Sequence, residues 1–305
     1  MNAPHSRPAG LALPWLHLLL GVAVVAVWGT NFVVIKVALA DLPPLLFATL
    51  RFTCAFLPMA LFLPRPAVPW RRLAAYGVLI GAGQFGLLYL AMQSWISPGL
   101  ASLVIQSQVF FTIALSMRAN GERVRLFQVA ALLLATSGIG LIIAHGGGDA
   151  TPPGIALVLL AALSWSGGNM VARADPHANM LGYVVWASLF SVPPLLALSL
   201  LIEGPAAIAA GLARAGPGTW AAVLWQSVGN TMFGYAAWGW LLARHPAATV
   251  TPLALLVPVF GMSASALLLG ESLPGWKLGA AGLVIAGLAL NLLWPRLAAL
   301  RPRPA

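Results

Sequence analysis

Charged residues are scarce in this chain. Asp, Glu, Lys and Arg together make up 7% of its 305 residues, whereas hydrophobic residues make up 60%. A soluble domain carries about 25% charged residues, so this chain cannot cover a water-facing surface. The composition excludes a soluble protein and indicates one that lies in a lipid bilayer.

Acidic residues are scarcer still. An integral membrane enzyme acting on lipids or prenyl groups needs paired carboxylates for a metal and a diphosphate, or a Ser/His/Asp set. No two acids lie close together in one apolar run or one short loop, so the sequence predicts no catalytic residue, no metal ligand and no cofactor. Proton-driven transporters usually carry Asp, Glu or His within the membrane, and we expect no such carboxylate relay here. The six acids, all in loops or at the ends of apolar runs, are Asp41, Glu122, Asp149, Asp175, Glu203 and Glu271.

Cysteine is nearly absent, and basic residues form no cluster. The single Cys54 excludes an internal disulfide and a zinc site. The net charge is +10, but no Lys/Arg patch is interleaved with aromatic residues in the way that a groove for single-stranded nucleic acid requires. We therefore expect no nucleic-acid partner.

What the chain does contain is ten apolar runs of about 20 residues, the length that crosses a bilayer as a helix. These runs lack the alternation of period two that is typical of a membrane barrel, so they predict helices, which satisfy their own backbone groups. The expected spans are His17–Leu39, Pro44–Leu63, Leu73–Met92, Gly99–Met117, Leu126–Ala144, Pro153–Val171, Leu181–Leu201, Thr219–Leu242, Ala247–Leu269 and Trp276–Trp294.

The distribution of basic residues predicts the orientation. With ten spans and a cytoplasmic N-terminus, only Arg214 and Lys277 fall outside, and this asymmetry is the one that cytoplasmic loops show. We expect a multi-pass protein of the cell inner (plasma) membrane, surrounded by lipid, with both termini cytoplasmic and residues 295–305 as a tail. The twelve basic residues on the cytoplasmic side would be Arg7, Arg65, Arg71, Arg72, Arg118, Arg123, Arg125, Arg173, Arg244, Arg296, Arg301 and Arg303.

Two sequence patterns recur in the two halves. Trp28 to Lys36 aligns with Trp165 to Arg173, and later Gly121-Glu122-Arg123 aligns with Gly270-Glu271-Ser272, followed by Gln128 with Lys277. Each half holds five spans, and an odd number inserts the halves in opposite directions. The sequence thus predicts residues 1–144 as one repeat, 145–153 as a linker and 154–294 as a second, inverted repeat. Inverted repeats place a transporter's site at their interface.

These motifs resemble a known family. Trp28-Gly-Thr-Asn31-Phe, the Gly-Glu-Arg motif and the Gly-rich last span of each half resemble the drug/metabolite transporter (DMT) superfamily, EamA family, and more narrowly its YddG-type aromatic amino acid exporters. The resemblance covers Trp15 to Trp294. It implies the ten-helix EamA/DMT transporter fold and a central cavity walled by spans other than the fifth and tenth. One departure is Gln108, which precedes Val109-Phe110 where the family often has proline.

Polar and aromatic side chains within spans are the candidates for the site, because polar groups in a bilayer are costly. For any single amide, a hydrogen bond that joins two helices is an equally good explanation. Gln106 and Gln108 are two positions apart and cannot share one narrow helical face, so we expect one to line the cavity and the other to bond a neighbouring helix. The expected substrate-binding residues are Trp28, Asn31, Gln84, Tyr89, Gln106, Gln108, Trp165, Asn169, Trp186, Gln226, Asn230 and Arg51.

Two cations, two tryptophans and one loop give further expectations. Lys36 is expected to reach the external interface and pair with Asp41, whereas Arg51 lies deeper and requires an internal partner or a substrate carboxylate. Trp165 and Trp186 fall near span centres, which favours a cavity over lipid-facing packing. The stretch from Glu203 to Pro217 fits an interfacial helix and an ordinary external loop equally well.

The leading functional hypothesis is the export of small metabolites, most of all aromatic or apolar amino acids and analogues, by alternating access through a central cavity. The alternative is a broad-specificity drug/metabolite exporter. A membrane assembly factor would not require the inverted repeat, and an enzyme would require the acid pair that is missing. We expect a non-enzymatic protein that functions as a monomer.

Overall fold

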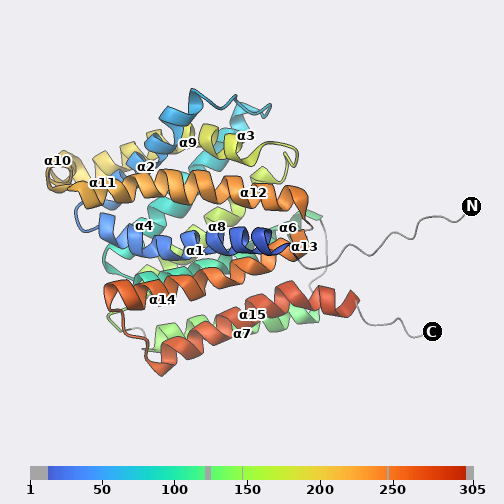
Figure 1. Ribbon diagram of the computed structural model, residues 1–305. Helices are drawn as coiled ribbons and strands as arrows, with labels where there is room; N and C mark the ends of the chain where they lie inside the picture. Colours follow the sequence, from blue (N-terminus) through green and yellow to red (C-terminus); the bar gives the residue numbers. More distant parts are fainter. Residues whose placement is uncertain (1–12, 121–124, 146, 246, 300–305) are drawn as a thin grey trace, which may run out of the picture.

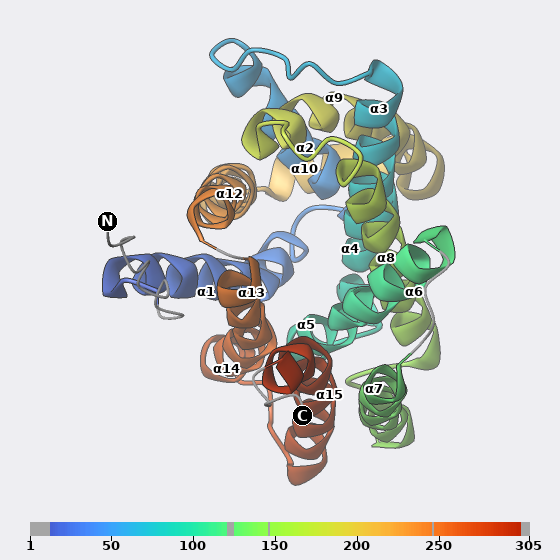
Figure 2. The ribbon, with the colours of Figure 1, turned by 90° about the vertical axis from the view of Figure 1, so that its right-hand side faces the viewer.

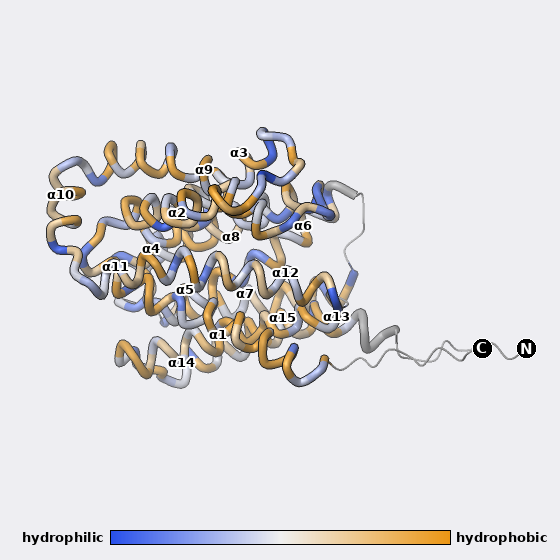
Figure 3. Tube along the Cα trace, turned by 45° about the horizontal axis from the view of Figure 1, so that its top comes forward, coloured by the Kyte–Doolittle hydropathy of each residue, from blue (hydrophilic) through white to orange (hydrophobic). Residues whose placement is uncertain are grey.

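A computed structural model describes residues 13–120, 125–145, 147–245 and 247–299. Over these ranges the chain is helical and forms no strand beyond one isolated bridge between Ile96 and Ala150. Hydrophobic stretches cover most of each helix and hydrophilic stretches gather near the helix ends and turns (Figure 3). The all-helical membrane architecture expected from the sequence is therefore confirmed.

Several of the helices change from α-helical to π-helical or 3₁₀ geometry part-way along their length. In chain order they are α1 (Trp15–Ala38), α2 (Pro44–Ala60), α3 (Trp70–Val78) with α4 (Leu87–Ser94), α5 (Pro98–Val104) with α6 (Gln108–Asn120), α7 (Leu126–His145), α8 (Pro152–Ala172), α9 (Met180–Leu198), α10 (Gly204–Arg214), α11 (Pro217–Leu224) with α12 (Gly234–Arg244), α13 (Ala247–Val250) with α14 (Val257–Leu269), and α15 (Gly275–Ala299).

Within the described residues, eight helical segments are long and apolar enough to cross a membrane. The second expected span is the shorter α2, of 17 residues. The eighth expected span, Thr219–Leu242, lies in α11 and α12, which are joined by the polar π-helical stretch Trp225–Phe233. This segment is not one of the eight long apolar segments of the structure. Length and hydropathy thus account for a multi-pass protein, and the count of ten spans stays a prediction.

The stretch after Glu203 is a helix rather than a plain loop. Gly204, the first residue of α10, adopts a φ of 81°, a conformation that favours glycine. It separates α10 from the π-helical stretch Ser199–Glu203 that follows α9. The Glu203 carboxylate accepts hydrogen bonds from the backbone N–H groups of Leu45 (2.6 Å) and Leu46 (3.1 Å) at the start of α2. Of the two possibilities that the sequence left open, the structure selects the helix.

Helix packing follows the same pattern in both halves. α1 packs along α14, α8 packs along α6, α2 packs on α9, and α7 packs on α15. The winding changes correspond too. A π-helical stretch joins α3 to α4 as another joins α11 to α12, and 3₁₀ stretches precede both α6 and α14. The α7–α15 pair lies to one side of the other helices (Figures 1 and 2).

Glycines permit the closest of these contacts. A Cβ atom on Gly287 of α15 would lie 2.5 Å from the carbonyl oxygen of Ala131 on α7, and one on Gly138 would lie 2.8 Å from that of Ala280. Small residues at such crossings let helix backbones approach within a membrane. The Gly-rich last span of each half therefore pairs with its counterpart.

Candidate substrate cavity

A cavity of about 870 Å³ lies between the helices of the two halves. Its walls come from α1, the start of α4 with the π-helical stretch before it, the start of α6 with the 3₁₀ stretch before it, α8, the start of α9, α12 with the π-helical stretch before it, and the start of α14 with the 3₁₀ stretch before it. Neither α7 nor α15 contributes a residue that the structure describes to the lining. This agrees with the arrangement that the family resemblance implied.

Eight of the twelve expected site residues line this cavity. Trp28 lies against two aromatic residues of α12, with its ring 5.2 Å from that of Trp238 and 6.0 Å from that of Tyr235, and its indole N–H donates to the backbone oxygen of Asn230 at 3.3 Å. Indole faces and amide groups together suit an amphipathic solute. The eight residues are Trp28, Asn31, Gln84, Gln106, Gln108, Trp165, Asn169 and Asn230.

Gln106 and Gln108 both line the cavity, so the expectation that only one would do so is wrong. Ile105–Ser107 winds as a 3₁₀ helix, and its three residues per turn bring positions two apart closer to one face than an α-helix does. The side-chain oxygen of Gln108 accepts a bond from the Asn169 amide at 3.3 Å. That bond joins α6 to α8 at the cavity wall.

The remaining four expected residues do not line the cavity. Tyr89 is fully buried, and its hydroxyl accepts from Arg51. Gln226 is fully buried, and both polar atoms of its amide lack a hydrogen-bond partner among the described residues. Trp186 donates to the backbone oxygen of Leu63 at 3.0 Å and packs against Trp70. Its position near the middle of an apolar run was misleading, because its indole reaches a helix end instead of the cavity.

Arg51 is buried just behind the cavity wall. Its exposed fraction is 1%, its guanidinium nitrogens donate to the Tyr89 and Thr231 hydroxyls at 2.8 Å each, and it stacks 3.8 Å from the ring centre of Phe85, which lines the cavity. The expected internal partner is therefore confirmed. No described carboxylate lies within 4 Å of it, so its charge is not neutralised by an ion pair.

Lys36 does not pair with Asp41, contrary to the expectation. Its ammonium donates to the backbone oxygens of Met92 (3.3 Å) and Gln93 (3.1 Å) at the end of α4. The last carbonyls of a helix attract cations, which explains this choice. The Asp41 carboxylate instead accepts from the Thr219 hydroxyl.

The twelve expected site residues leave out much of the aromatic wall. Phe32, Phe85, Tyr235, Trp238 and Trp240 also line the cavity. Tyr235 and Trp238 are three positions apart on α12 and so share a face. That spacing, directly after Gly234, is the sequence signal that could have added them to the expected set, and in the structure Gly234 lies against the Trp28 indole.

The cavity opens at one end of the molecule. Its lining there includes Pro176, His177 and Asn179, which are exposed. Asp175 lines the same rim and pairs with Arg72 at 2.5 Å, and it is the only described carboxylate in the lining. No described lysine or arginine lines the cavity. Solutes can therefore enter the cavity from this end.

The opposite end of the cavity is closed by packed side chains. The lining there finishes at Leu88, Ile105 and Val257, and Met92, Val104 and Gly261, farther along these helices toward the closed end, are buried. All residues of α5 are buried, which at 1.5 Å per residue gives a plug about 10 Å thick. Ser102 of α5 touches Gly261 of α14, where an added Cβ would lie 2.5 Å from the serine oxygen.

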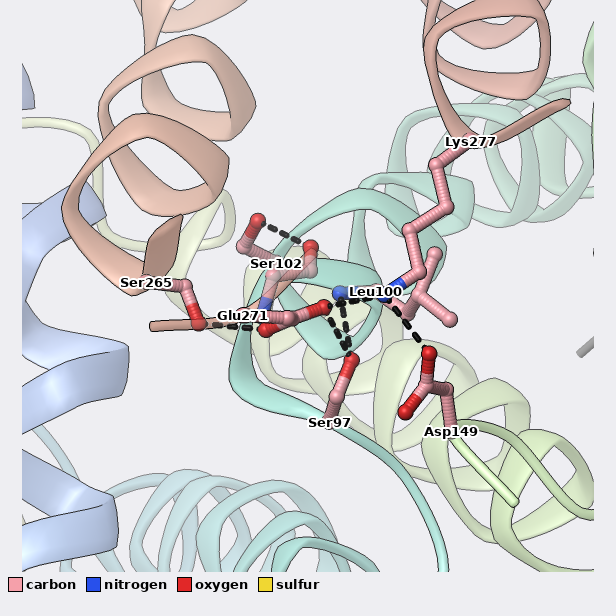
Figure 4. A network of polar contacts seen from close by, with 8 residues as sticks. Ser97, Leu100, Ser102, Asp149, Ser265, Glu271 and Lys277 are labelled. Carbon is pink, nitrogen blue, oxygen red and sulfur yellow. Dashed lines mark hydrogen bonds and ion pairs between the residues drawn. The ribbon is translucent and has the colours of Figure 1, made fainter. Parts of the chain in front are cut away.

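A polar cluster covers the plug (Figure 4). The Glu271 carboxylate accepts from the Ser97 hydroxyl (2.6 Å), the Gly99 backbone N–H (3.1 Å), the Ser265 hydroxyl and the Lys277 ammonium (2.9 Å). Burial raises the pKa of Glu271, but the bonds from these serines and Lys277 outweigh it, and the pKa is lowered from its ordinary value of 4.5. Glu271 is therefore ionised at neutral pH.

A helical membrane protein with a cavity that is open at one end and closed at the other has the architecture of a transporter. The profile of the EamA-like transporter family matches residues 15–144 and 152–293. The chain belongs to the EamA-like transporter family.

Similar proteins extend over nearly the whole chain. It is 41% identical to a "Probable amino-acid metabolite efflux pump" of Salmonella typhimurium, over 90% of this chain and 93% of that protein. It is 28% identical to a "Probable terminal-alkyne amino-acid exporter" of Streptantibioticus cattleyicolor, over 88% and 91% of the two chains. One crystal structure has the same fold, with a TM-score of 0.66 and 20% identity, over 95% of this chain and 99% of that one.

Proposed function

We propose that this protein exports amino acids and related small metabolites from the cell by alternating access. The observation that carries the proposal is the 870 Å³ cavity lined by amides and aromatic rings, with exposed residues at one end and buried helix α5 at the other. The names of the similar efflux pump and exporter favour amino acids over unrelated drugs. A broad drug/metabolite exporter is the second candidate, favoured by the aromatic wall.

The proposal includes the inner membrane as location, ten spans and two inverted halves. Residues 1–144 and 154–294 would be the halves, 145–153 the linker and 295–305 a cytoplasmic tail. The matching packing pairs and winding changes of the two halves support this. With both termini cytoplasmic, as the arginine distribution favours, the open rim at Asp175 and His177 faces the cytoplasm and the Glu271 cluster faces outward.

Charge at the two ends of the cavity would orient a zwitterion. The unneutralised Arg51 lies behind Phe85, whereas Asp175 lies at the rim. A charge buried without a counter-ion in a membrane protein marks a functional site by default. The carboxylate of an amino acid would point toward the Arg51 end, and its ammonium group toward the rim and the indole faces, where cation–π attraction adds to binding.

Transport by the purified protein in lipid vesicles tests the function. Vesicles loaded with labelled phenylalanine should release it faster than protein-free vesicles. Trp28→Ala should slow release at least tenfold, because Trp28 makes the central aromatic contacts of the cavity, whereas Trp220→Ala on α11, outside the lining, should not. Failure of every amino acid to move would refute amino acid export, and movement of apolar drugs alone would favour the second candidate.

Derivatised substrates test the orientation. Compared with phenylalanine, its methyl ester lacks the carboxylate charge and N-acetylphenylalanine lacks the ammonium charge. Both should be exported more slowly by the wild type. In Arg51→Gln the ester should lose its disadvantage and the N-acetyl compound should keep it. Equal handling of all three compounds by the wild type would contradict the proposed orientation.

A further inference from the structure

We propose that Glu271 and Lys277 form an ionic latch that holds the external end of the cavity shut and must part for substrate release. The proposal rests on the proposed function for its two assumptions, alternating access and an outward-facing Glu271 cluster. It assigns a gating role to residues that do not line the cavity.

The latch joins the two halves of the chain at one carboxylate. Glu271 lies in the turn between α14 and α15 and bonds Ser265 and Lys277 within the second half. It also bonds the Ser97 hydroxyl and the Gly99 N–H at the start of α5, in the first half (Figure 4). A single side chain therefore couples the helices that form the plug.

Gly99 and Gly270 make this junction possible. Gly270 has a φ of 68°, which ends α14 and turns the chain toward α5. A Cβ on Gly99 would lie 3.0 Å from a carboxylate oxygen of Glu271, so the absence of a side chain lets the acid reach the backbone N–H. The local backbone thus positions Glu271 against α5.

Lys277 extends the latch to the linker. Its side chain is fully buried and pairs with Glu271 at 2.9 Å and with Asp149 at 2.8 Å. The linker is held in turn by backbone bonds to the α4–α5 turn, from Ser97 to Asp149 (2.7 Å) and from Thr151 to Trp95 (2.9 Å). A buried ammonium is stable only with its partners. Moving either the α4–α5 turn or the linker disturbs the partners of Lys277, so the two movements are energetically linked.

The plug cannot open while these bonds are intact. α5 is the part of the plug that separates Ile105, at the deep end of the cavity, from the outer surface. Any path for substrate along α5 requires its start to move away from the α14–α15 turn. That movement breaks the bonds from Ser97 and Gly99 to Glu271.

The repeat-related position lacks this charge. Gln128, which aligns with Lys277 in the first half, accepts one bond from the backbone N–H of Arg125 at 2.8 Å and forms no described ion pair. Glu122, which aligns with Glu271, lies outside the described residues. This difference in charge favours a firmer closure at the external end of the cavity than at the cytoplasmic end. Gln128 supplies a matched control for substitutions of Lys277.

External protons should not operate the latch under ordinary conditions. Around Glu271 lie Lys277, Asp149, the two serine hydroxyls and the start of α5, while His145 stacks on Trp276 one position from Lys277. Because Glu271 is ionised well below neutrality, the latch stays charged. We expect substrate binding, not external acid, to drive its opening.

Labelling of a cysteine in the plug tests the latch. Cys54 is replaced by Ala, and Val104, fully buried at the inner end of α5, is replaced by Cys. Intact cells are then treated with a membrane-impermeant maleimide in the presence and absence of phenylalanine. Glu271→Gln and Lys277→Met should raise the labelling rate at least tenfold, whereas Gln128→Met should leave it at the parent rate.

A milder variant and a transport assay complete the test. If the charge variants fail to accumulate as folded protein, the milder Ser97→Ala variant should raise labelling severalfold, because it removes one bond across the halves. Folded variants that label at the parent rate would overturn the latch. Labelling that rises while no amino acid is transported would leave the latch standing and refute the proposed function instead.

Discussion

The two ends of the cavity are held together in different ways. At the closed end, Glu271 and Lys277 are almost completely buried and connect α5, the α14–α15 turn and the linker. At the open end, the described polar contacts are more exposed. The Arg72 side chain of the pair with Asp175 is 35% exposed, and Arg173 bonds Ser116 at an exposed site. The cation of the ion pair is therefore fully buried at the closed end and partly exposed at the open end, whereas Asp175 (13% exposed) is nearly as buried as Glu271 (9% exposed).

The two kinds of ion pair differ in what the loss of one partner costs. A buried ion pair costs desolvation energy, and removing one partner is strongly destabilising because the other charge remains buried. Exposed pairs contribute about 0–1 kcal/mol. The same kind of substitution should therefore have unequal effects at the two ends.

The largest effect is expected from Lys277→Met. This change leaves Glu271 beside Asp149 without a cation, and we expect it to reduce the free energy of unfolding by about 3 kcal/mol. Thermal unfolding in detergent measures it, with Gln128→Met as the control at the repeat-related position. A variant that unfolds at the wild-type temperature would show that the two ends do not differ in this way.

The next largest effect is expected where α1 packs closely against α14. Gly29→Ala places a Cβ 2.5 Å from the Phe260 Cβ and 2.6 Å from the Val257 oxygen, so α1 must move away from α14. Overpacking of this kind costs about 1–3 kcal/mol. Gly140→Ala on α7 meets nothing within 4 Å and should not lower the unfolding temperature. Equal unfolding temperatures for both variants would contradict the close contact of α1 with α14.

A smaller effect depends on pH. Because the pKa of Glu271 is lowered from 4.5 in the folded protein, its contribution to stability is fully present above that value and is lost as the pH falls through the lowered pKa. The difference in unfolding temperature between wild type and Glu271→Gln should be constant from pH 6 to 8 and shrink near pH 4. A difference that already shrinks between pH 8 and pH 6 would indicate that Glu271 is not held ionised by its neighbours.

The smallest effect is expected at the open end. Asp175→Asn removes the ion pair with Arg72, which is partly exposed, and should change the free energy of unfolding by less than about 1 kcal/mol. Thermal unfolding alongside Lys277→Met gives the direct comparison. An equally large loss in both variants would mean that the open end is also held by buried charge.

The sequence predicted the cavity better than the latch. Trp28, Asn31 and Asn169 could be selected because polar or aromatic groups inside apolar runs are conspicuous whatever the tertiary structure. Gln108 was placed less well because the 3₁₀ winding beside it is not encoded in a simple periodicity. Ser97 and Glu271 could not be connected, since they are far apart in sequence and meet only through packing of α5 on α14.

Side-specific access to the cavity tests the central claim most directly. In a Cys54→Ala background, Ala172 at the cavity lining is replaced by Cys and treated with an impermeant maleimide in intact cells and in inverted membrane vesicles. The account predicts rapid labelling in inverted vesicles, slow labelling in intact cells, and protection by phenylalanine. Rapid labelling from the outside, with no protection by amino acids, would contradict it.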